Sequence, residues 1–253
     1  MLIKRLLVYF CPFLIFLGLE LIFYQIKLIP VCLIFIFLVL ITCLKVLIKE
    51  KLFSLNFFYL SILPFLLIFL AIGWLFILNE IWLRQFIILI LIFILGLYLE
   101  NIFLFFYNSA LYQIESLENF STFLSLLIFF LLSINLNTLN VFLNFQLWLL
   151  SLILVAISTL LILQSFWANR LKGKMQFIYL LILNIIVLEI FWGLFFLPTN
   201  FYVNSLILTI FFYFCWGVFK AKLKDKLDKK SLQRYFIIST ILLLLTILTS
   251  SWI

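Results

Sequence analysis

Three glutamates inside long apolar runs are the residues of this 253-residue chain whose type and position could do chemistry: Glu20, Glu100 and Glu189. A charged side chain at the centre of a bilayer costs about 2.5–3.5 kcal/mol on insertion scales, so such residues usually serve a function. Glu20 lies four residues from the end of its run, within reach of the membrane interface. Glu100 and Glu189 lie deeper and are the stronger candidates.

Glu100 has polar neighbours at helical spacing. In a helix, which turns about 100° per residue, Glu100, Asn101, Tyr107 and Asn108 fall on one largely polar face. Such a face must turn toward the interior of a helix bundle or toward a wet crevice. A hydrogen-bonded packing seam and a path for a ligand or ion both explain the pattern, and the sequence leaves both open.

Neither deep glutamate has a cationic partner at its own depth, because no Lys or Arg falls inside the hydrophobic part of any run. A protonated carboxyl, a hydrated cavity or an external cation would each lower the cost of burial. The pattern favours proton-coupled or cation transport over hydrolysis. The predicted ligand or ion path therefore consists of Glu100, Asn101, Tyr107, Asn108 and Glu189.

The composition excludes several kinds of chemistry. The chain has no His, which excludes His-ligated haem, His-ligated zinc and His general-base catalysis. Its four Cys residues form no C-x-x-C pair, and no glycine-rich phosphate-binding motif is present among six Gly residues. We therefore predict no cofactor, no metal site and no enzymatic activity.

The elements that position these residues are apolar helices. Hydrophobic residues make up 68% of the chain, charged residues 10%, and the mean hydropathy is +1.40, whereas soluble domains carry about 25% charged residues. The sequence predicts an all-α polytopic transmembrane bundle forming one integral membrane domain. Nine spans are expected, with eight or ten left open and the fifth the weakest; they cover residues 6–24, 28–48, 57–78, 85–107, 120–136, 144–166, 176–197, 201–219 and 235–253.

Charge fixes the expected orientation. With the N-terminus in the cytoplasm, every Lys and Arg except Lys27 and Arg84 falls on the cytoplasmic side of this threading, as the positive-inside rule requires. The C-terminus is then external, and the net charge of +8 reflects topology in the cytoplasmic membrane and not nucleic-acid binding. A basic interfacial loop or helix over 220–234 is expected to contact anionic inner-leaflet lipid through Lys220, Lys222, Lys224, Lys226, Lys229, Lys230 and Arg234.

An internal similarity links the third and seventh spans. At an offset of 120 residues, Tyr59, Leu60, Ile62, Leu63, Gly73 and Phe76 match Tyr179, Leu180, Ile182, Leu183, Gly193 and Phe196 without gaps. Both spans run in the same direction, so a parallel repeat is geometrically allowed. Chance matches are common in a chain this rich in Leu and Ile.

Three functions remain open. The first is a small permease or transporter that uses the intramembrane carboxylates. The second is a non-catalytic scaffold or subunit that forms homo- or hetero-oligomers through polar helix faces, such as the seven-residue repeat of Ser151, Ser158 and Ser165. The third, an enzyme acting on lipid-linked substrates, is weakest because acid and base groups are so few.

The orientation can be tested directly. Reporter fusions within 220–234 should be active only with a cytoplasmic reporter, because this stretch carries the densest positive charge. Activity of a periplasm-type reporter at the same position would contradict the threading.

Overall fold

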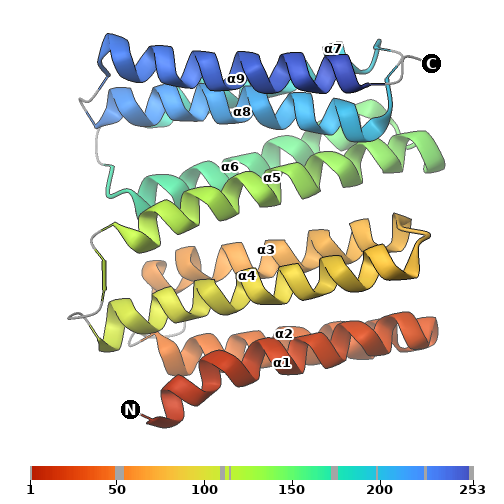
Figure 1. Cartoon of the computed structure of the whole chain (residues 1–253), viewed down its shortest axis with the longest axis vertical. Coiled ribbons are helices and arrows are strands. Elements are labelled where there is room, and N and C mark those ends of the chain that lie inside the picture. Colours follow the sequence, from red (N-terminus) through yellow and green to blue (C-terminus); the bar gives the residue numbers. More distant parts are fainter. Residues whose placement is uncertain are drawn as a thin grey trace. The chain divides into compact units, whose positions relative to one another are not determined.

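The computed structural model of the chain is all-helical. It describes residues 2–48, 54–108, 112–113, 115–171, 176–197, 199–224 and 227–250, and this part of the chain forms nine α-helices (Figure 1). They are α1 (Leu2–Tyr24), α2 (Ile29–Leu47), α3 (Leu55–Ile77), α4 (Ile81–Tyr107), α5 (Ser116–Leu143), α6 (Leu147–Ala168), α7 (Gln176–Leu194), α8 (Phe201–Leu223) and α9 (Lys229–Thr249), with a short 3-10 turn, η1 (Ile26–Leu28), after α1.

All nine helices are long and apolar enough to cross a membrane. Helices of this length and composition indicate a multi-pass membrane protein and confirm the predicted all-α class and helix number. The predicted boundaries differ most at α5, which extends from Ser116 to Leu143 instead of covering 120–136. The polar residues that ended the apolar run do not end the helix, because their side chains donate to its carbonyls: Asn135 to Leu131 at 2.8 Å and Asn137 to Ser133 at 2.9 Å.

The basic stretch at 220–234 also differs from its predicted form. Lys220 and Lys222 lie in the last turn of α8, Lys224 caps that helix, and Lys229, Lys230 and Arg234 lie in the first two turns of α9. Lys226 lies outside the described residues. The charges therefore extend two long helices at one end and do not form a separate helix. The capping box of Asp228 and Ser231 explains why α9 begins as early as Lys229.

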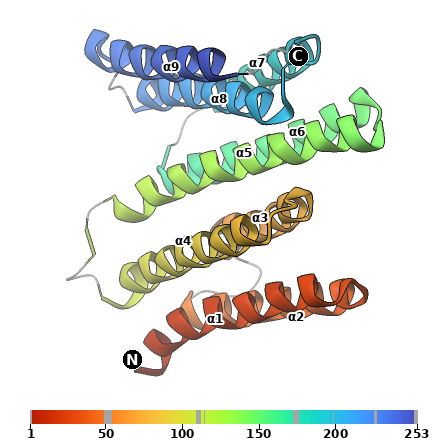
Figure 2. The same ribbon diagram turned by 45° about the vertical axis from the view of Figure 1, so that its right-hand side comes forward.

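The chain divides into two compact units, Met1–Leu124 and Ser125–Ile253. In the first unit, α1 packs mainly against α2 and α4, and α3 packs against the same two helices. In the second unit, α8 packs against α7 and α9, and α6 packs against α7 (Figure 2). The stacked rings of Phe129 and Phe212, 4.0 Å apart and 8° from parallel, join α5 to α8.

The helix boundaries follow the predicted 120-residue offset. Adding 120 to the bounds of α4, 81 and 107, gives 201 and 227, and α8 covers 201–223. The same shift takes α1 to 122–144, α2 to 149–167 and α3 to 175–197, which correspond to α5, α6 and α7. Four helices thus match the next four, and α9 stands outside the match.

A hydrogen bond joins the first and fourth of these helices in each set, and one of its two positions follows the same offset. In the first unit, Gln85 Nε2 of α4 donates to Glu20 Oε2 of α1 at 2.9 Å. In the second, Asn137 Nδ2 of α5 donates to Ser205 Oγ of α8 at 2.9 Å, and Ser205 is the counterpart of Gln85. The fourth-helix positions of the two contacts, Gln85 and Ser205, are thus related by the offset, whereas Asn137 corresponds to Leu17 and not to Glu20. The matching helix bounds and this shared fourth-helix position support a parallel four-helix repeat.

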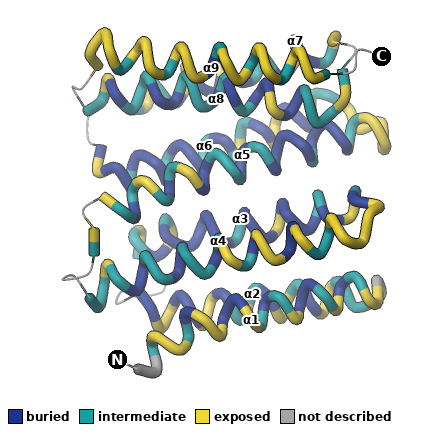
Figure 3. Tube along the Cα trace, in the orientation of Figure 1, coloured by how far each residue is buried: buried dark blue, intermediate teal, exposed yellow. Residues whose placement is uncertain are grey.

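Helix α9 packs on α8 of the second unit, and a glycine lies at one of the contacts. Most of its residues are exposed, and Ser239 is the one buried residue described in this helix (Figure 3). The ring of Tyr235 lies so close to Gly217 of α8 that a Cβ there would come within 2.6 Å of Cε1. The missing side chain of Gly217 therefore lets α9 approach α8.

We predict that Gly217→Ala loosens α9, because the added methyl group cannot fit against Tyr235 without moving it. Overpacking of this kind costs about 1–3 kcal/mol. Gly96→Ala is the matched control, because its methyl group would meet Pro12 Cγ at an ordinary 3.8 Å. Thermal unfolding in detergent should show a lower midpoint for Gly217→Ala only, and equal midpoints would contradict the role of this contact.

Candidate functional site

The helix pair α1 and α4 brings most of the predicted site residues to one interface. Near the start of α1, Lys4 Nζ donates to the hydroxyl of Tyr107 at 3.0 Å and lies 4.4 Å from the centre of its ring. The same hydroxyl donates to the carbonyl of Val46 in α2 at 3.2 Å. Tyr107 therefore connects a cation of α1 to the end of α2.

Glu100 of α4 contacts α1 at the same interface, next to the Lys4–Tyr107 contact. The hydroxyl of Tyr9 donates to Glu100 Oε1 at 3.4 Å, and the carboxylate is half-buried. A neutral phenol thus stands beside the glutamate that has no cation at its depth. We call Lys4, Tyr9, Glu100 and Tyr107 the Glu100 cluster.

The other two members of the predicted polar face have different neighbours. Asn101 donates to the carbonyl of Leu97 at 2.8 Å and accepts from Ser116 Oγ, at the start of α5, at 2.6 Å. Asn108 caps α4, with its N–H donated to the carbonyl of Leu104 at 3.1 Å. The single face predicted from the sequence therefore divides between contacts to α1, to α5 and to the helix end.

A second polar cluster lies at the opposite end of the same helix pair, and we call Glu20, Arg84 and Gln85 the Glu20 cluster. Glu20 accepts from Gln85 through Oε2, while its Oε1 is buried and finds no hydrogen-bond partner among the described residues. Arg84 Nη2 donates to the carbonyl of Leu78 at 2.6 Å, and its guanidinium carbon lies 4.7 Å from the ring centre of Phe23. Arg84 Nε is likewise buried without a described partner.

The two clusters are separated by an apolar contact. Pro12 lies inside α1, has no N–H, and therefore leaves the carbonyl of Val8 without its helical donor. Pro12 faces Gly96 of α4, which has room for no more than a small side chain at ordinary contact distance. Tyr9 and Glu20 are eleven residues apart, roughly 16 Å along a helix. The α1–α4 interface thus has polar groups at both ends and a proline in between.

Sequence reasoning missed Tyr9, Arg84 and Gln85 as site residues. Their partners are Glu100, Leu78 and Glu20, and two of the three contacts join residues more than 60 positions apart. The available signal was antiparallel pairing. Once α1 and α4 are antiparallel neighbours, the residue number on α4 must fall as the number on α1 rises, and the contact pairs do so: 4 with 107, 9 with 100 and 20 with 85.

Glu189, the last predicted site residue, lies on α7 in the second unit, and its side chain is exposed. The polar groups around it belong to a seam between α6 and α7. Ser158 Oγ donates to Asn184 Oδ1 at 2.5 Å, and Trp192 Nε1 donates to Ser151 Oγ at 2.8 Å. Two serines of the α6 stripe, Ser151 and Ser158, thus bond to α7, whereas Ser165 lies 3.4 Å from Ser125 of α5. The place of Glu189 on a transport path stays a prediction.

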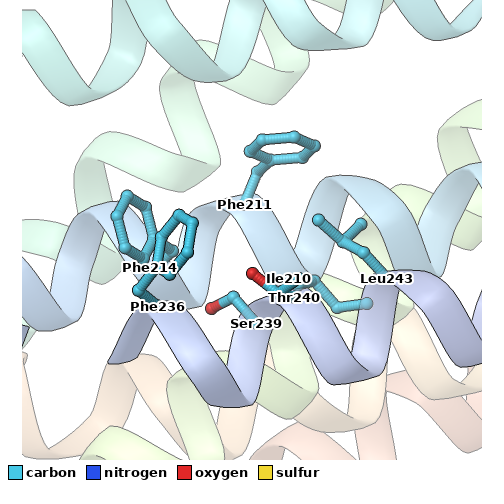
Figure 4. A pocket seen from close by; sticks show the side chains of 7 residues that line it. All are labelled: Ile210, Phe211, Phe214, Phe236, Ser239, Thr240 and Leu243. Atoms are coloured by element: carbon cyan, nitrogen blue, oxygen red, sulfur yellow. The ribbon is translucent and has the colours of Figure 1, made fainter. Parts of the chain in front are cut away.

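A pocket of about 100 Å³ lies between α8 and α9 (Figure 4). Its lining is almost wholly apolar and contains Ser239, whose buried Oγ finds no partner within the described chain; the other lining residues are Ile210, Phe211, Phe214, Phe236, Thr240 and Leu243. None of them is a predicted site residue. Within the described residues, no three His, Cys, Asp or Glu side chains are grouped to hold a metal ion.

Comparison with known proteins places the chain in a family without naming an activity. The match covers residues 12–249 and is to a family described as "Protein of unknown function (DUF5656)". No curated protein and no solved structure matches the chain. Because the match includes all nine helices at least in part, the chain belongs to the DUF5656 family.

Proposed function

We propose that this protein is a small permease-like transporter that moves a proton or a small cation along the interface of α1 and α4. The observation that carries the proposal is the position of two carboxylates, Glu20 and Glu100, on one helix pair on either side of Pro12. Carboxylates at membrane depth that face a protein interior usually bind or relay cations. The proposal includes no catalytic step.

Glu100 has the chemistry to hold the transported ion at one end. Tyr9 donates to Oε1, so Oε2 is left to accept a proton or to face a cation. Lys4 does not neutralise the carboxylate, because its Nζ is held by Tyr107. The exchange of one proton between Glu100 and water would then need only a small opening of the helix pair.

Glu20 supplies the corresponding group at the other end. Its Oε1 is a buried acceptor without a described partner, and an unpaired buried carboxylate oxygen costs free energy until a proton, a cation or water binds it. The nearby guanidinium of Arg84 makes release of a bound cation easier, since like charges repel. Glu20 and Glu100 thus offer a cation-binding group near each end of the interface, and an ion would pass from one to the other as the helix pair opens at one end and then at the other.

Pro12 is the element that would allow the two ends to open in turn. A proline inside a helix removes one backbone hydrogen bond and is a common point of bending. Because it faces Gly96, α1 meets little side-chain volume on α4 when it bends. The four-helix repeat adds support, because parallel repeats are a common plan in transporters.

The proposal places the protein in the cytoplasmic membrane, with the basic ends of α8 and α9 against anionic lipid. Lys220, Lys222, Lys229, Lys230 and Arg234 would attract such lipid by about 1 kcal/mol for each charge near the surface. The Lys222 ammonium also lies 5.7 Å from the ring centre of Tyr179, which holds it at this end of the bundle.

We predict that Glu100→Gln lowers ion flux at least tenfold, because the amide cannot exchange a proton or balance a cation. Flux would be followed in proteoliposomes with a trapped pH dye under imposed H⁺, Na⁺ and K⁺ gradients. Glu20→Gln should also lower it, whereas Glu118→Gln, a carboxylate outside the α1–α4 interface, should not. Wild-type protein that moves none of these ions, or wild-type flux in Glu100→Gln with an unchanged helical spectrum, would contradict the proposal.

We predict that Pro12→Ala lowers flux several-fold without unfolding the protein. Alanine restores the N–H that the carbonyl of Val8 lacks, so α1 becomes straighter and bends less readily. Pro64→Ala is the matched control, because Pro64 lies inside α3, away from the two clusters. Equal flux in Pro12→Ala and wild type, at equal thermal stability, would remove the bending step from the mechanism.

A further inference from the structure

Helix α7 presents an exposed face that repeats every three and four residues. Ile178, Ile182, Ile185, Glu189 and Trp192 are all exposed, and their spacing alternates four, three, four, three. The opposite side of α7 packs against α6 and α8. A seam with this mean spacing of 3.5 residues is what two helices need to pack along their length at about 20°.

Lipid acyl chains cannot form hydrogen bonds with Glu189, which lies in this exposed face. Glu189 lies five residues before the end of α7 and eight before Leu197, roughly 8–12 Å along the axis, too far for its short side chain to reach water. Trp192, one turn further along α7, donates its Nε1 to Ser151 Oγ on α6. A carboxylate at that depth, facing acyl chains, would be costly. Its exposure therefore indicates that another polar group covers it.

Gly193 gives a second, independent indication. It lies one turn after Glu189 on the same exposed face, and a Cβ placed on it would meet nothing within 4 Å. The fold of the described chain therefore does not need a glycine here, in contrast to Gly217. Exposed small residues in membrane helices let the backbone of another helix approach closely.

We propose that the occupant of this face is α7 of a second copy of the protein, related by a two-fold axis along the membrane normal. Two copies inserted in the same orientation run α7 parallel, and a two-fold axis sets each stripe residue against itself. Glu189 then meets Glu189 of the partner subunit at the same depth. One neutral carboxyl donates to the other carboxylate, so the pair shares one proton and neither needs a cation.

This occupant fits better than a contact through a cation of the same chain. No Lys or Arg lies at the depth of Glu189 in any span, so another helix of the copy could offer no ion pair. In the symmetric dimer, Glu189 of one copy meets Glu189 of the partner subunit, so each carboxyl finds a hydrogen-bond partner at its own depth. It also brings Gly193 of both copies to the place where the backbones come closest.

The test is a cysteine crosslink in native membranes. Ile185→Cys should form a disulfide-linked dimer on mild oxidation, since a stripe residue meets itself across the axis. Ile241→Cys is the matched control, because Ile241 on α9 is an equally exposed isoleucine, 53% against 56%. Absence of the dimer in Ile185→Cys, equal dimer in both variants, or a crosslink to a different protein would overturn the proposal.

A second measurement distinguishes dimerisation through the polar contact from non-specific association. The dimer fraction in liposomes, measured by energy transfer between labelled copies at increasing lipid dilution, should fall at least tenfold in Glu189→Leu and Gly193→Leu. Glu189→Gln should keep the dimer, because two amides also hydrogen-bond each other. Each variant should keep the wild-type helical content, because both positions are exposed on α7. Unchanged dimerisation of Glu189→Leu would overturn the proposal.

Discussion

The constraint on which this structure depends is that a bilayer offers no hydrogen bonds. Every polar group inside the hydrocarbon must find its partner within the protein or another bound molecule. The backbone meets this demand by forming nine helices in the described chain, and polar side chains meet it in pairs between helices. Ser158 with Asn184 and Asn137 with Ser205 are examples, each joining two helices of the second unit.

The three intramembrane glutamates meet the same demand to different degrees. Glu100 has one donor, Tyr9. Glu20 has one donor for Oε2 and none described for Oε1. Glu189 is exposed on α7. A carboxylate oxygen that has no donor within the chain is a place where a ligand or another subunit can bind favourably. That is why the first two glutamates suggest an ion path, and the third suggests an interface between copies.

The sequence predicted the helices far better than their contacts, and the reason is physical. A run of apolar residues is a local property, so α2 and α4 were located to within four residues at each end. At α5 the prediction was too short, because Asn135 and Asn137 look like helix-ending residues but bond to their own helix. The Tyr9–Glu100 contact joins residues 91 positions apart, and nothing local distinguishes Tyr9 from the other aromatic residues of α1.

The 120-residue offset relates the residues of the proposed ion path to their counterparts in the second unit. At the 120-residue offset, Glu20 corresponds to Asn140, Arg84 to Asn204 and Gln85 to Ser205, so the two charged residues of the Glu20 cluster become neutral polar residues in the second unit. Tyr9 corresponds to Phe129, which has no hydroxyl and stacks on Phe212, and Glu100 corresponds to Lys220 at the helix end. The phenol and the carboxylate that it contacts are therefore both missing from the second unit. If Tyr9 and Glu100 act together, we expect both to be replaced in a unit that does not use them. A packing contact alone would not require that both residues be replaced.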